Sequence, residues 1–323
     1  IAEQLNRLNL SIYTPSLYIF DSVKEDYEIN MEGSGISIDG REKGLRKLMA
    51  TNLLKRLESS VNSFRLTLQR IQEYIDETLN TIESNGCSGS VDVTEFTDDL
   101  DSADSDNDPF VGRNSKINLR DIDVIRWSRD LRSDQENLAL LQIMLLDISP
   151  EHDSKLQMLI EDLKHKFEHP INPGNRKVII FTAFADTANY LYDQLAARIK
   201  ADCGLNVALI TGSTDGKCTI PKFPMSFNNV LTYFSPVSKD RAALFPDATE
   251  EIDVLIATDC ISEGQNLQDC DFLINYDIHW NPVRIIQRFG RVDRIGSRND
   301  VIQLVNYWPD MELDQYIELK GRV

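Results

Sequence analysis

An arginine-rich segment near the carboxyl-terminal end, QRFGRVDRIGS, has the residue types and the spacing for phosphate chemistry. Gln287, Arg291 and Arg294 stand at positions i, i+4 and i+7, so a continuous helix would bring all three side chains to one face. A planar guanidinium donates several hydrogen bonds and can stabilise the negative charge on a transferring γ-phosphoryl group. The segment is therefore predicted to present cations to a phosphate.

The residues that flank this segment predict where its helix begins and ends. Asn281 can cap free N–H groups and Pro282 suits a first turn, so the pair indicates a helix start. Gly290 and Gly296 favour an early end, which would place Arg294 on the following loop. The simpler interpretation is an ordinary helix that ends in solvated arginines. We assign the neighbouring arginines to that class or to salt bridges: Arg284, Arg288 and Arg298.

The nearest candidate for a phosphate-binding loop, GSTDGKCT, does not match the Walker A pattern. Only three residues separate Gly212 from Gly216, and Cys218 stands where a Ser or Thr hydroxyl should bind Mg²⁺. The following TIPKFP contains two prolines and cannot open a helix whose N-terminus would hold phosphate. We expect a turn and loop here, and a chain that is no complete ATPase by itself.

Two segments carry a resemblance to a known family. ATDCISEGQNLQ, residues 257–268, and QRFGRVDRIGS, residues 287–297, resemble motifs V and VI of the superfamily 2 helicases and translocases. The intervening YDIHWNP resembles the SWI/SNF-like branch. We name these two stretches the motif V segment and the motif VI segment. The resemblance covers about the last half of the chain, and it implies that Arg291 and Arg294 are arginine fingers and that Gln287 supports nucleotide contact.

The resemblance also implies two groups of binding residues. On the nucleotide side it places Ser262, Glu263, Gly264 and Asn266, and on the nucleic-acid side Thr182, Thr211, Gly212 and Thr258. Gly264 would permit a close backbone approach or a positive φ. The alternative for the motif V segment is an ordinary strand-to-helix turn. An irregular insertion at about 217–236 departs from the family pattern.

Composition restricts what this chain does alone. Its 323 residues carry a net charge of −18, whereas a stand-alone nucleic-acid binder is usually basic. Eight acidic residues and no basic one lie between Asp92 and Asp108. The polar stretch 84–116 that contains them predicts a disordered acidic loop. A calcium loop is excluded, since DLDSADSDNDPF has no Gly at its sixth position and no Glu at its twelfth.

The cysteines and histidines form no metal-ligand pattern, so no metal site is predicted. No C-x-x-C pair occurs among the five cysteines, which are Cys87, Cys203, Cys218, Cys260 and Cys270. Reduced thiols in a cytoplasmic protein are the expectation. No apolar run reaches the ~20 residues that span a bilayer, so no membrane association is expected. The chain begins at Ile1 rather than Met, which favours a fragment of a longer protein.

Two regions differ in their hydrophobic period. Apolar residues recur at three- and four-residue steps from 45 to 82, which predicts a long helix or a helical hairpin. From Lys177 onward the runs KVIIFT, NVALITG, DVLIAT, DFLINYD and VIQLVNYW alternate with helical stretches and predict an α/β fold with a parallel sheet. We expect a mainly helical region over 1–148 and a domain over 149–323, which the resemblance makes RecA-like.

The favoured function is the C-terminal lobe of an ATP-dependent DNA helicase or translocase. ATP and Mg²⁺ would be bound mainly by a first RecA-like lobe of the same protein, and this chain alone would be inactive. Nucleic acid is the expected partner, with DNA favoured over RNA. One alternative is a catalytically inactive lobe that serves as a protein-interaction scaffold. A dinucleotide or nucleotide-sugar enzyme is a third option, but FTAFADT lacks the glycines of its phosphate-binding turn.

Overall fold

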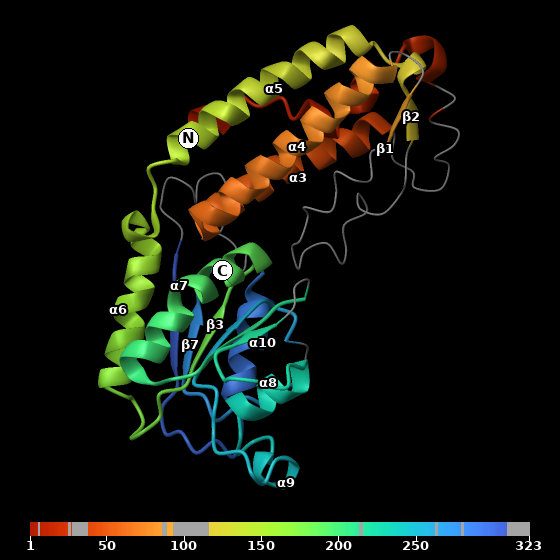
Figure 1. Cartoon of the computed structure of the whole chain (residues 1–323). Coiled ribbons are helices and arrows are strands. Elements are labelled where there is room, and N and C mark those ends of the chain that lie inside the picture. The colour runs from red at the N-terminus through yellow and green to blue at the C-terminus, as the bar shows by residue number, and fades with distance from the viewer. Residues whose placement is uncertain are drawn as a thin grey trace. The chain divides into compact units, whose positions relative to one another are not determined.

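The computed structural model divides the chain into two compact units (Figure 1). The described residues are 1–5, 7–24, 27, 38–85, 89–92, 116–212, 216–261, 264–278 and 281–308. Unit 1 comprises Ile1–Lys55 and Phe64–Asp147, and unit 2 comprises Arg56–Ser63 and Ile148–Val323. The expected domain limits stay a prediction, and the units differ from them in one respect. Arg56–Ser63, which we name the corner, belongs to the second unit.

Unit 1 is mainly helical, as the sequence predicts. Its helices are α1 (Ala2–Leu5), α5 (Val124–Leu145), most of α3 (Ile38–Ser59) and of α4 (Val61–Asn85), and the 3-10 helices η1 (Ser11–Tyr13), η2 (Pro15–Tyr18), η3 (Asp21–Val23) and η7 (Leu119–Asp121). The expected apolar stripe is buried along α4 at Phe64, Leu68, Ile71 and Ile75. On α5, the indole N–H of buried Trp127 donates to the Ser11 carbonyl at 3.0 Å.

A serine breaks the long helical pattern into two helices. The Ser60 hydroxyl accepts a hydrogen bond from the Ser63 N–H at 3.0 Å, which is the geometry of an N-cap. A new helix, α4, can therefore begin at Val61 directly after α3 ends at Ser59. The sequence left open a single helix or a helical hairpin, and the break at Ser60 is the feature that separates the two helices.

Most of the acidic loop expected over 84–116 lies outside the described residues. Its described ends differ from that expectation. Strand β1 (Ser90–Asp92) pairs antiparallel with β2 (Lys116–Asn118), and Val91 stands opposite Ile117. Both apolar side chains are buried, so this short pair of strands has an apolar cross-strand contact. The polar composition of 84–116 does not indicate that contact.

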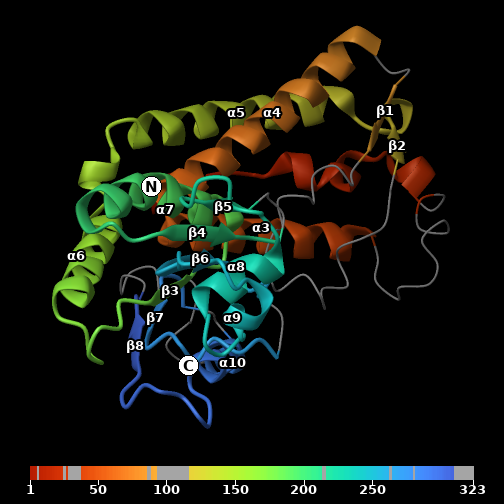
Figure 2. The ribbon, with the colours of Figure 1, turned by 60° about the horizontal axis from the view of Figure 1, so that its bottom comes forward.

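Unit 2 contains one six-stranded sheet in the order β5-β4-β6-β3-β7-β8 (Figure 2). Its strands are β3 (Val178–Phe181), β4 (Val207–Ile210), β5 (Lys217–Cys218), β6 (Val254–Ala257), β7 (Phe272–Asn275) and β8 (Gln303–Asn306). Its helices are η8 (Pro150–His152), α6 (Ser154–Glu168), α7 (Ala185–Cys203), α8 (Phe227–Phe234), α9 (Arg241–Leu244) and α10 (Pro282–Val292). Every pairing is parallel except that of β4 with β5. The predicted parallel sheet flanked by helices is confirmed, with the short β5 as an antiparallel edge strand.

Helices cover both faces of this sheet, which explains why its central strands are continuous apolar runs rather than alternating ones. Val178 and Ile180 of β3 pack with α6 and α7 on one face. Ile179 and Phe181 of the same strand pack on the other face with α8 and with Val292 of α10. All four residues of β3 are therefore buried.

The parallel strands deliver their carboxyl ends to one edge of the sheet, which is where ligands bind in folds of this kind. Backbone hydrogen bonds tie three of these ends together. The Thr182 N–H donates to the Ala257 carbonyl at 3.0 Å, and the Thr258 N–H donates to the Ile210 carbonyl at 3.2 Å. The loops that carry the predicted binding residues therefore start side by side. Among the described helices, none has the length and the apolar content to cross a membrane.

Candidate functional site

Helix α10 begins and ends where its flanking residues predict. The Asn281 side chain accepts a hydrogen bond from the Val283 N–H at 3.0 Å, and Pro282 occupies the first turn. The helix ends at Val292, so Arg294 lies on the following loop, with its Nε donating to the Gly290 carbonyl at 3.1 Å. Helical geometry therefore unites only Gln287 and Arg291 on one face.

Arg291 is largely buried and is connected through its backbone to the motif V segment. Only 7% of the residue is exposed, and its carbonyl accepts a hydrogen bond from the Leu267 N–H at 2.9 Å. Gln287, one helical turn earlier, is half-buried. The carbonyl contact holds the end of α10 against the loop to which the resemblance assigns the nucleotide-side residues.

Arg288 is the residue that sequence reasoning underestimated. Its guanidinium makes a bidentate pair with the Asp259 carboxylate, with Nε–Oδ1 at 2.7 Å and Nη2–Oδ2 at 2.6 Å. Nη1 donates to the Asn275 side chain at 2.9 Å and to the Asp277 carbonyl at 3.2 Å. Only 1% of Arg288 is exposed, and it lies 5.1 Å from the centroid of the Phe181 ring. The expected salt bridge is therefore present, but the solvated alternative is wrong for this arginine.

The pair joins three parts of the site, because Asp259 belongs to the motif V segment, Arg288 to the motif VI segment and Asn275 to β7. The pair has a bidentate geometry, and Arg288 donates further hydrogen bonds to Asn275 and to the Asp277 carbonyl, as the burial of a guanidinium requires. The sequence signal for it is an acid directly after the strand run DVLIAT, together with an arginine one residue after Gln287. Neither position reveals its partner, since the two residues are 29 positions apart in the sequence.

The nucleotide-side residues of the motif V segment are described in part. Ser262 and Glu263 lie outside the described residues. Gly264 has φ +89°, the left-handed region that the sequence interpretation allowed for. The Asn266 side chain accepts a hydrogen bond from the Gln268 N–H at 3.2 Å, which closes a local turn.

The predicted nucleic-acid residues fall into two groups. Thr211, Gly212 and Thr258 line the sheet edge, and a Cβ placed on Gly212 would lie 3.4 Å from the Cys260 Cβ. Thr182 is different: it is fully buried, and its hydroxyl donates to the Asp277 carboxylate at 2.5 Å. A structural role therefore accounts for Thr182, and its contact with nucleic acid stays a prediction.

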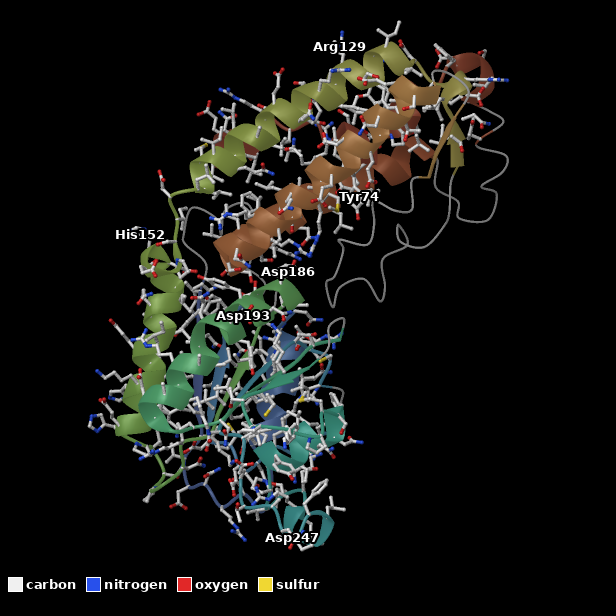
Figure 3. The ribbon with its side chains drawn as sticks, in the orientation of Figure 1. Tyr74, Arg129, His152, Asp186, Asp193 and Asp247 are labelled. Carbon is white, nitrogen blue, oxygen red and sulfur yellow. The ribbon has the colours of Figure 1, made fainter. Side chains whose placement is uncertain are left out.

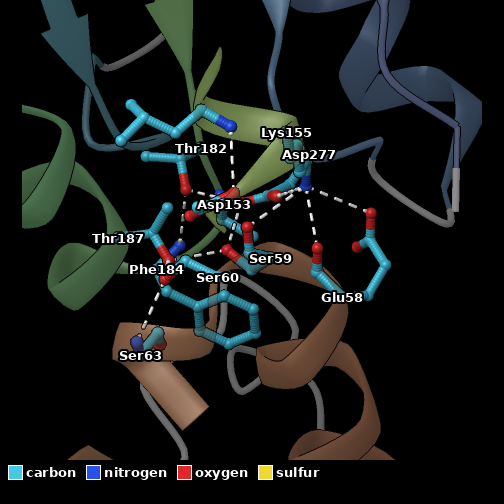
Figure 4. A network of polar contacts seen from close by, with 12 residues as sticks. Glu58, Ser59, Ser60, Ser63, Asp153, Lys155, Thr182, Phe184, Thr187 and Asp277 are labelled. Carbon is cyan, nitrogen blue, oxygen red and sulfur yellow. Dashed lines mark hydrogen bonds and ion pairs between the residues drawn. The ribbon is translucent and has the colours of Figure 1, made fainter. Parts of the chain in front are cut away.

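Asp277 lies at the centre of the polar network that Figure 4 shows. Its carboxylate accepts hydrogen bonds from the Thr182 hydroxyl, from the Ser59 hydroxyl at 2.7 Å and from the Ala183 N–H at 3.0 Å. The Lys155 ammonium lies 3.0 Å from the other carboxylate oxygen. The strand end after β7 is thus bound to the start of α6 and to the corner.

The corner also forms an ion pair with α7. The buried Arg56 guanidinium lies 2.8 Å from the carboxylate of Asp186, which Figure 3 labels on α7, and 4.8 Å from the Phe184 ring centroid. The Ser59 hydroxyl also lies 2.6 Å from the Thr187 hydroxyl. These contacts explain why a segment that the sequence assigns to the helical region belongs to unit 2.

The electrostatics of the network follow from its burial. Burial raises the pKa of Glu58 to about 7, although the Lys155 ammonium 3.2 Å away opposes that shift. Asp277 has a lowered pKa, because Lys155 and the hydroxyl donors outweigh the effect of burial. Glu58 and Asp277 together raise the pKa of Lys155 despite its burial. Lys155 and Asp277 are therefore both charged at neutral pH.

The end of α10 carries two arginines whose roles stay predictions. The Arg291 backbone contacts the loop that contains Gly264, and Arg294 follows the helix. Guanidinium groups are suited to binding anions such as phosphate. The described residues contain no group of three His, Cys, Asp or Glu side chains that could hold a metal ion.

Part of this chain is similar to a known protein domain. A model of the helicase conserved C-terminal domain matches residues 154–296. An uncharacterized ATP-dependent helicase of Bacillus subtilis (strain 168), YqhH, is 55% identical over 51 residues, which make up 16% of this chain and 9% of that protein. The RNA polymerase-associated protein RapA of Pectobacterium atrosepticum is 40% identical over 74 residues, 23% of this chain and 8% of that one. The matched segments therefore span less than a tenth of either relative's length.

One solved structure extends over nearly the whole chain. The crystal structure of the C-terminal part of the Fun30 ATPase domain covers 97% of this chain and 86% of its own, with a TM-score of 0.38 and 15% identity. That likeness is too weak to support a conclusion about function.

Proposed function

We propose that this chain contains the second lobe of an ATP-driven DNA translocase, because its residues 154–296 match the helicase conserved C-terminal domain. Its partner would be a first RecA-like lobe that binds ATP and Mg²⁺, since this chain has no Walker A loop. The observation that carries the proposal is the double connection between the motif V and motif VI segments. Arg288 binds Asp259, and Leu267 binds the Arg291 carbonyl.

ATP·Mg²⁺ supplies the phosphoryl group that water attacks. On domain closure, the guanidinium groups of Arg291 and Arg294 stabilise charge on the γ-phosphate. Gln287 supports the nucleotide from the same face of α10 as Arg291. Gly264 and Asn266, with Ser262 and Glu263, meet the nucleotide from the motif V segment. Because that segment is bonded to α10, a change at the nucleotide is passed to the neighbouring strand-end loops.

Those loops form the proposed nucleic-acid track. Thr211, Gly212 and Thr258 stand at the ends of adjacent parallel strands, where hydroxyl and N–H groups can hold phosphates without reading sequence. DNA is favoured over RNA by the resemblance of YDIHWNP to the SWI/SNF-like branch. Repeated closure and opening of the two lobes would move them along the nucleic-acid backbone.

The test is ATP hydrolysis by the protein that joins this chain to its ATP-binding lobe, with duplex DNA, single-stranded DNA or RNA added. Arg291→Ala should lower turnover by about a thousandfold or more and leave nucleotide binding intact, as expected when an arginine finger is removed. The exposed Arg298→Ala serves as the matched control and should retain turnover. Unchanged turnover in Arg291→Ala would overturn the arginine-finger role. No hydrolysis in the unmodified protein under any condition would favour the scaffold alternative.

A further inference from the structure

Lys239, which the helicase motifs do not include, lies on a loop that is firmly attached to the motif V region. The loop joins α8 to α9, and its Val237 and Ser238 N–H groups donate to the Asp269 carboxylate at 2.7 and 3.0 Å. The Ser238 hydroxyl donates to the same carboxylate. The Lys239 ammonium donates to the side-chain oxygen of Gln265 in the motif V segment.

The loop after α10 is attached to the same stretch of chain. The Gln268 side chain donates to the Gly296 carbonyl at 3.5 Å, and the Gln268 carbonyl accepts from the Ser297 hydroxyl at 3.2 Å. The Asn299 side chain donates to that carbonyl at 3.0 Å. Residues 265–269 therefore hold two loops at once, one carrying Lys239 and the other Arg294.

The two cations carried by these loops influence each other and have only neutral partners in the described part of the chain. Burial lowers the pKa of the half-buried Lys239, and the Arg294 guanidinium lowers it further. Lys239 donates to an amide oxygen, and Arg294 donates to the Gly290 carbonyl. Among the described residues, no carboxylate forms an ion pair with either side chain. A bound anion would offset the repulsion between the two cations and accept hydrogen bonds from them.

We propose that Lys239 and Arg294 together form a phosphate-binding site, with Lys239 as a ligand-contacting residue supplied by the loop between α8 and α9. The assignment rests on the proposed function in so far as Arg294 faces a phosphate there. The ligand class is a phosphate group, which a nucleotide or a nucleic-acid backbone can supply. A lysine ammonium is a compact charge on a flexible stem and an arginine guanidinium is planar, so the two can contact different oxygens of one phosphate.

Site-resolved acetylation of the 323-residue chain tests the site directly, because acetic anhydride reacts with the neutral amine. At pH 8 Lys239 should react faster than the exposed Lys164, since a lowered pKa increases the fraction of free amine. Tripolyphosphate or a single-stranded DNA oligonucleotide should slow Lys239 severalfold and leave Lys164 unchanged. The more protective probe identifies the source of the phosphate. Protection by neither probe would overturn the proposal.

Variants of Arg294 and Lys239 test whether the two residues bind one phosphate together. Arg294→Ala should slow the acetylation of Lys239 and abolish its protection, because the repelling cation and half of the site are both removed. Persistent protection in that variant would overturn the shared site. In the protein that includes the ATP-binding lobe, Lys239→Gln should lower nucleic-acid-stimulated turnover by about tenfold to a hundredfold, the range for a lost hydrogen bond between charged groups. Lys239→Arg should restore most of it, and Lys164→Gln should have no effect.

These outcomes separate the two proposals. If Arg291→Ala abolishes turnover but tripolyphosphate and oligonucleotide leave Lys239 unprotected, the proposed function is supported and the proposed phosphate site at Lys239 is refuted. If Arg291→Ala leaves turnover unchanged while Lys239 is protected, the arginine-finger role falls and the phosphate site stands.

Discussion

Lys155 and Asp277 form an ion pair of 3.0 Å at the place where the corner joins the RecA-like unit. The ammonium also donates to the Glu58 and Ser59 carbonyls, at 2.9 and 3.2 Å. The Asp277 carboxylate in turn accepts hydrogen bonds from the Ser59 and Thr182 hydroxyls. One charge therefore satisfies the free carbonyls at the end of α3, while the other orders the chain after β3. An ion pair with this number of additional bonds can offset the cost of its burial.

Asp277→Asn should destabilise unit 2 strongly. The substitution leaves Lys155 without its second carboxylate and turns an amide N–H₂ toward groups that donate. Losing one partner of a buried pair costs about 3–5 kcal/mol, and we expect a loss in that range in urea unfolding. Asp202→Asn is the control, because that carboxylate is 65% exposed and its pair with Arg198 is a surface pair. A loss below about 1 kcal/mol for Asp277→Asn would contradict the central role of this carboxylate.

Glu58 should make stability depend on pH between about 4.5 and 7. The folded protein keeps the Glu58 proton up to a pKa of about 7, whereas the usual value is 4.5, so the folded state binds more protons in that window. Stability therefore falls as pH rises through it, by up to about 1.4 kcal/mol per pH unit. Asp277 has a lowered pKa, so its titration changes stability only at pH values below this window. Lys155 has a raised pKa, so its titration changes stability only above it.

Glu58→Gln should remove this part of the pH dependence. The measurement is the free energy of unfolding of the wild type and the variant at several pH values from 4.5 to 8. The exposed Glu161→Gln is the matched control and should keep the slope of the wild type. Parallel curves for Glu58→Gln and the wild type would show that Glu58 titrates as an ordinary carboxyl.

Arg288→Lys should separate the motif V segment from α10. A lysine keeps the charge but cannot reproduce the bidentate contact with Asp259 or reach Asn275 at the same time. We expect a loss of about 3 kcal/mol in unfolding free energy, and reduced turnover in the two-lobed protein. Arg284→Lys on the same helix is the control and should change stability by less than about 0.5 kcal/mol. Equal stabilities for the two variants would contradict a structural role for Arg288.

Two glycines near the site should respond to alanine in opposite directions. Gly264 has φ +89° and Gly290 lies within α10, and an added Cβ meets no atom within 4 Å at either position. Gly264→Ala should therefore cost about 1–2 kcal/mol of backbone strain, whereas Gly290→Ala should gain about 0.5–1 kcal/mol of helix stability. Thermal unfolding of the chain measures both effects. A gain in stability for Gly264→Ala would show that the loop needs no left-handed residue.

Local sequence patterns were sufficient to predict the parallel sheet and where α10 begins and ends. Apolar runs such as KVIIFT are long enough to mark strands buried on both faces, and Asn281 with Pro282 marks a helix start wherever it occurs. Arg294 could be placed beyond the helix because Gly290 and Gly296 weaken it locally. Each of these predictions depends on residues within one or two turns of each other.

The polar contacts of the site could not be predicted in this way. Arg288 is identical in type to the exposed Arg298, and it differs because the fold buries it beside the Asp259 carboxylate. Thr182 follows its strand as expected, but its partner Asp277 lies 95 positions away in the sequence. Lys239 falls in a stretch that no pattern assigns to the site. Such residues acquire their roles from partners that the chain brings together only when it folds.

Unit 2 consists of two stretches that are far apart in the sequence, and this affects the order in which its contacts form during folding. Its corner is separated from the rest of the unit by residues 64–147, and the Ser59–Asp277 bond joins residues 218 positions apart. Contacts of such separation require large loops to close and slow folding. During synthesis from the N-terminus, Ser59 can bind the Asp277 carboxylate only after the strands up to β7 have been synthesised. The last polar contacts of the lobe therefore form after β7 has been added, however early the corner leaves the ribosome.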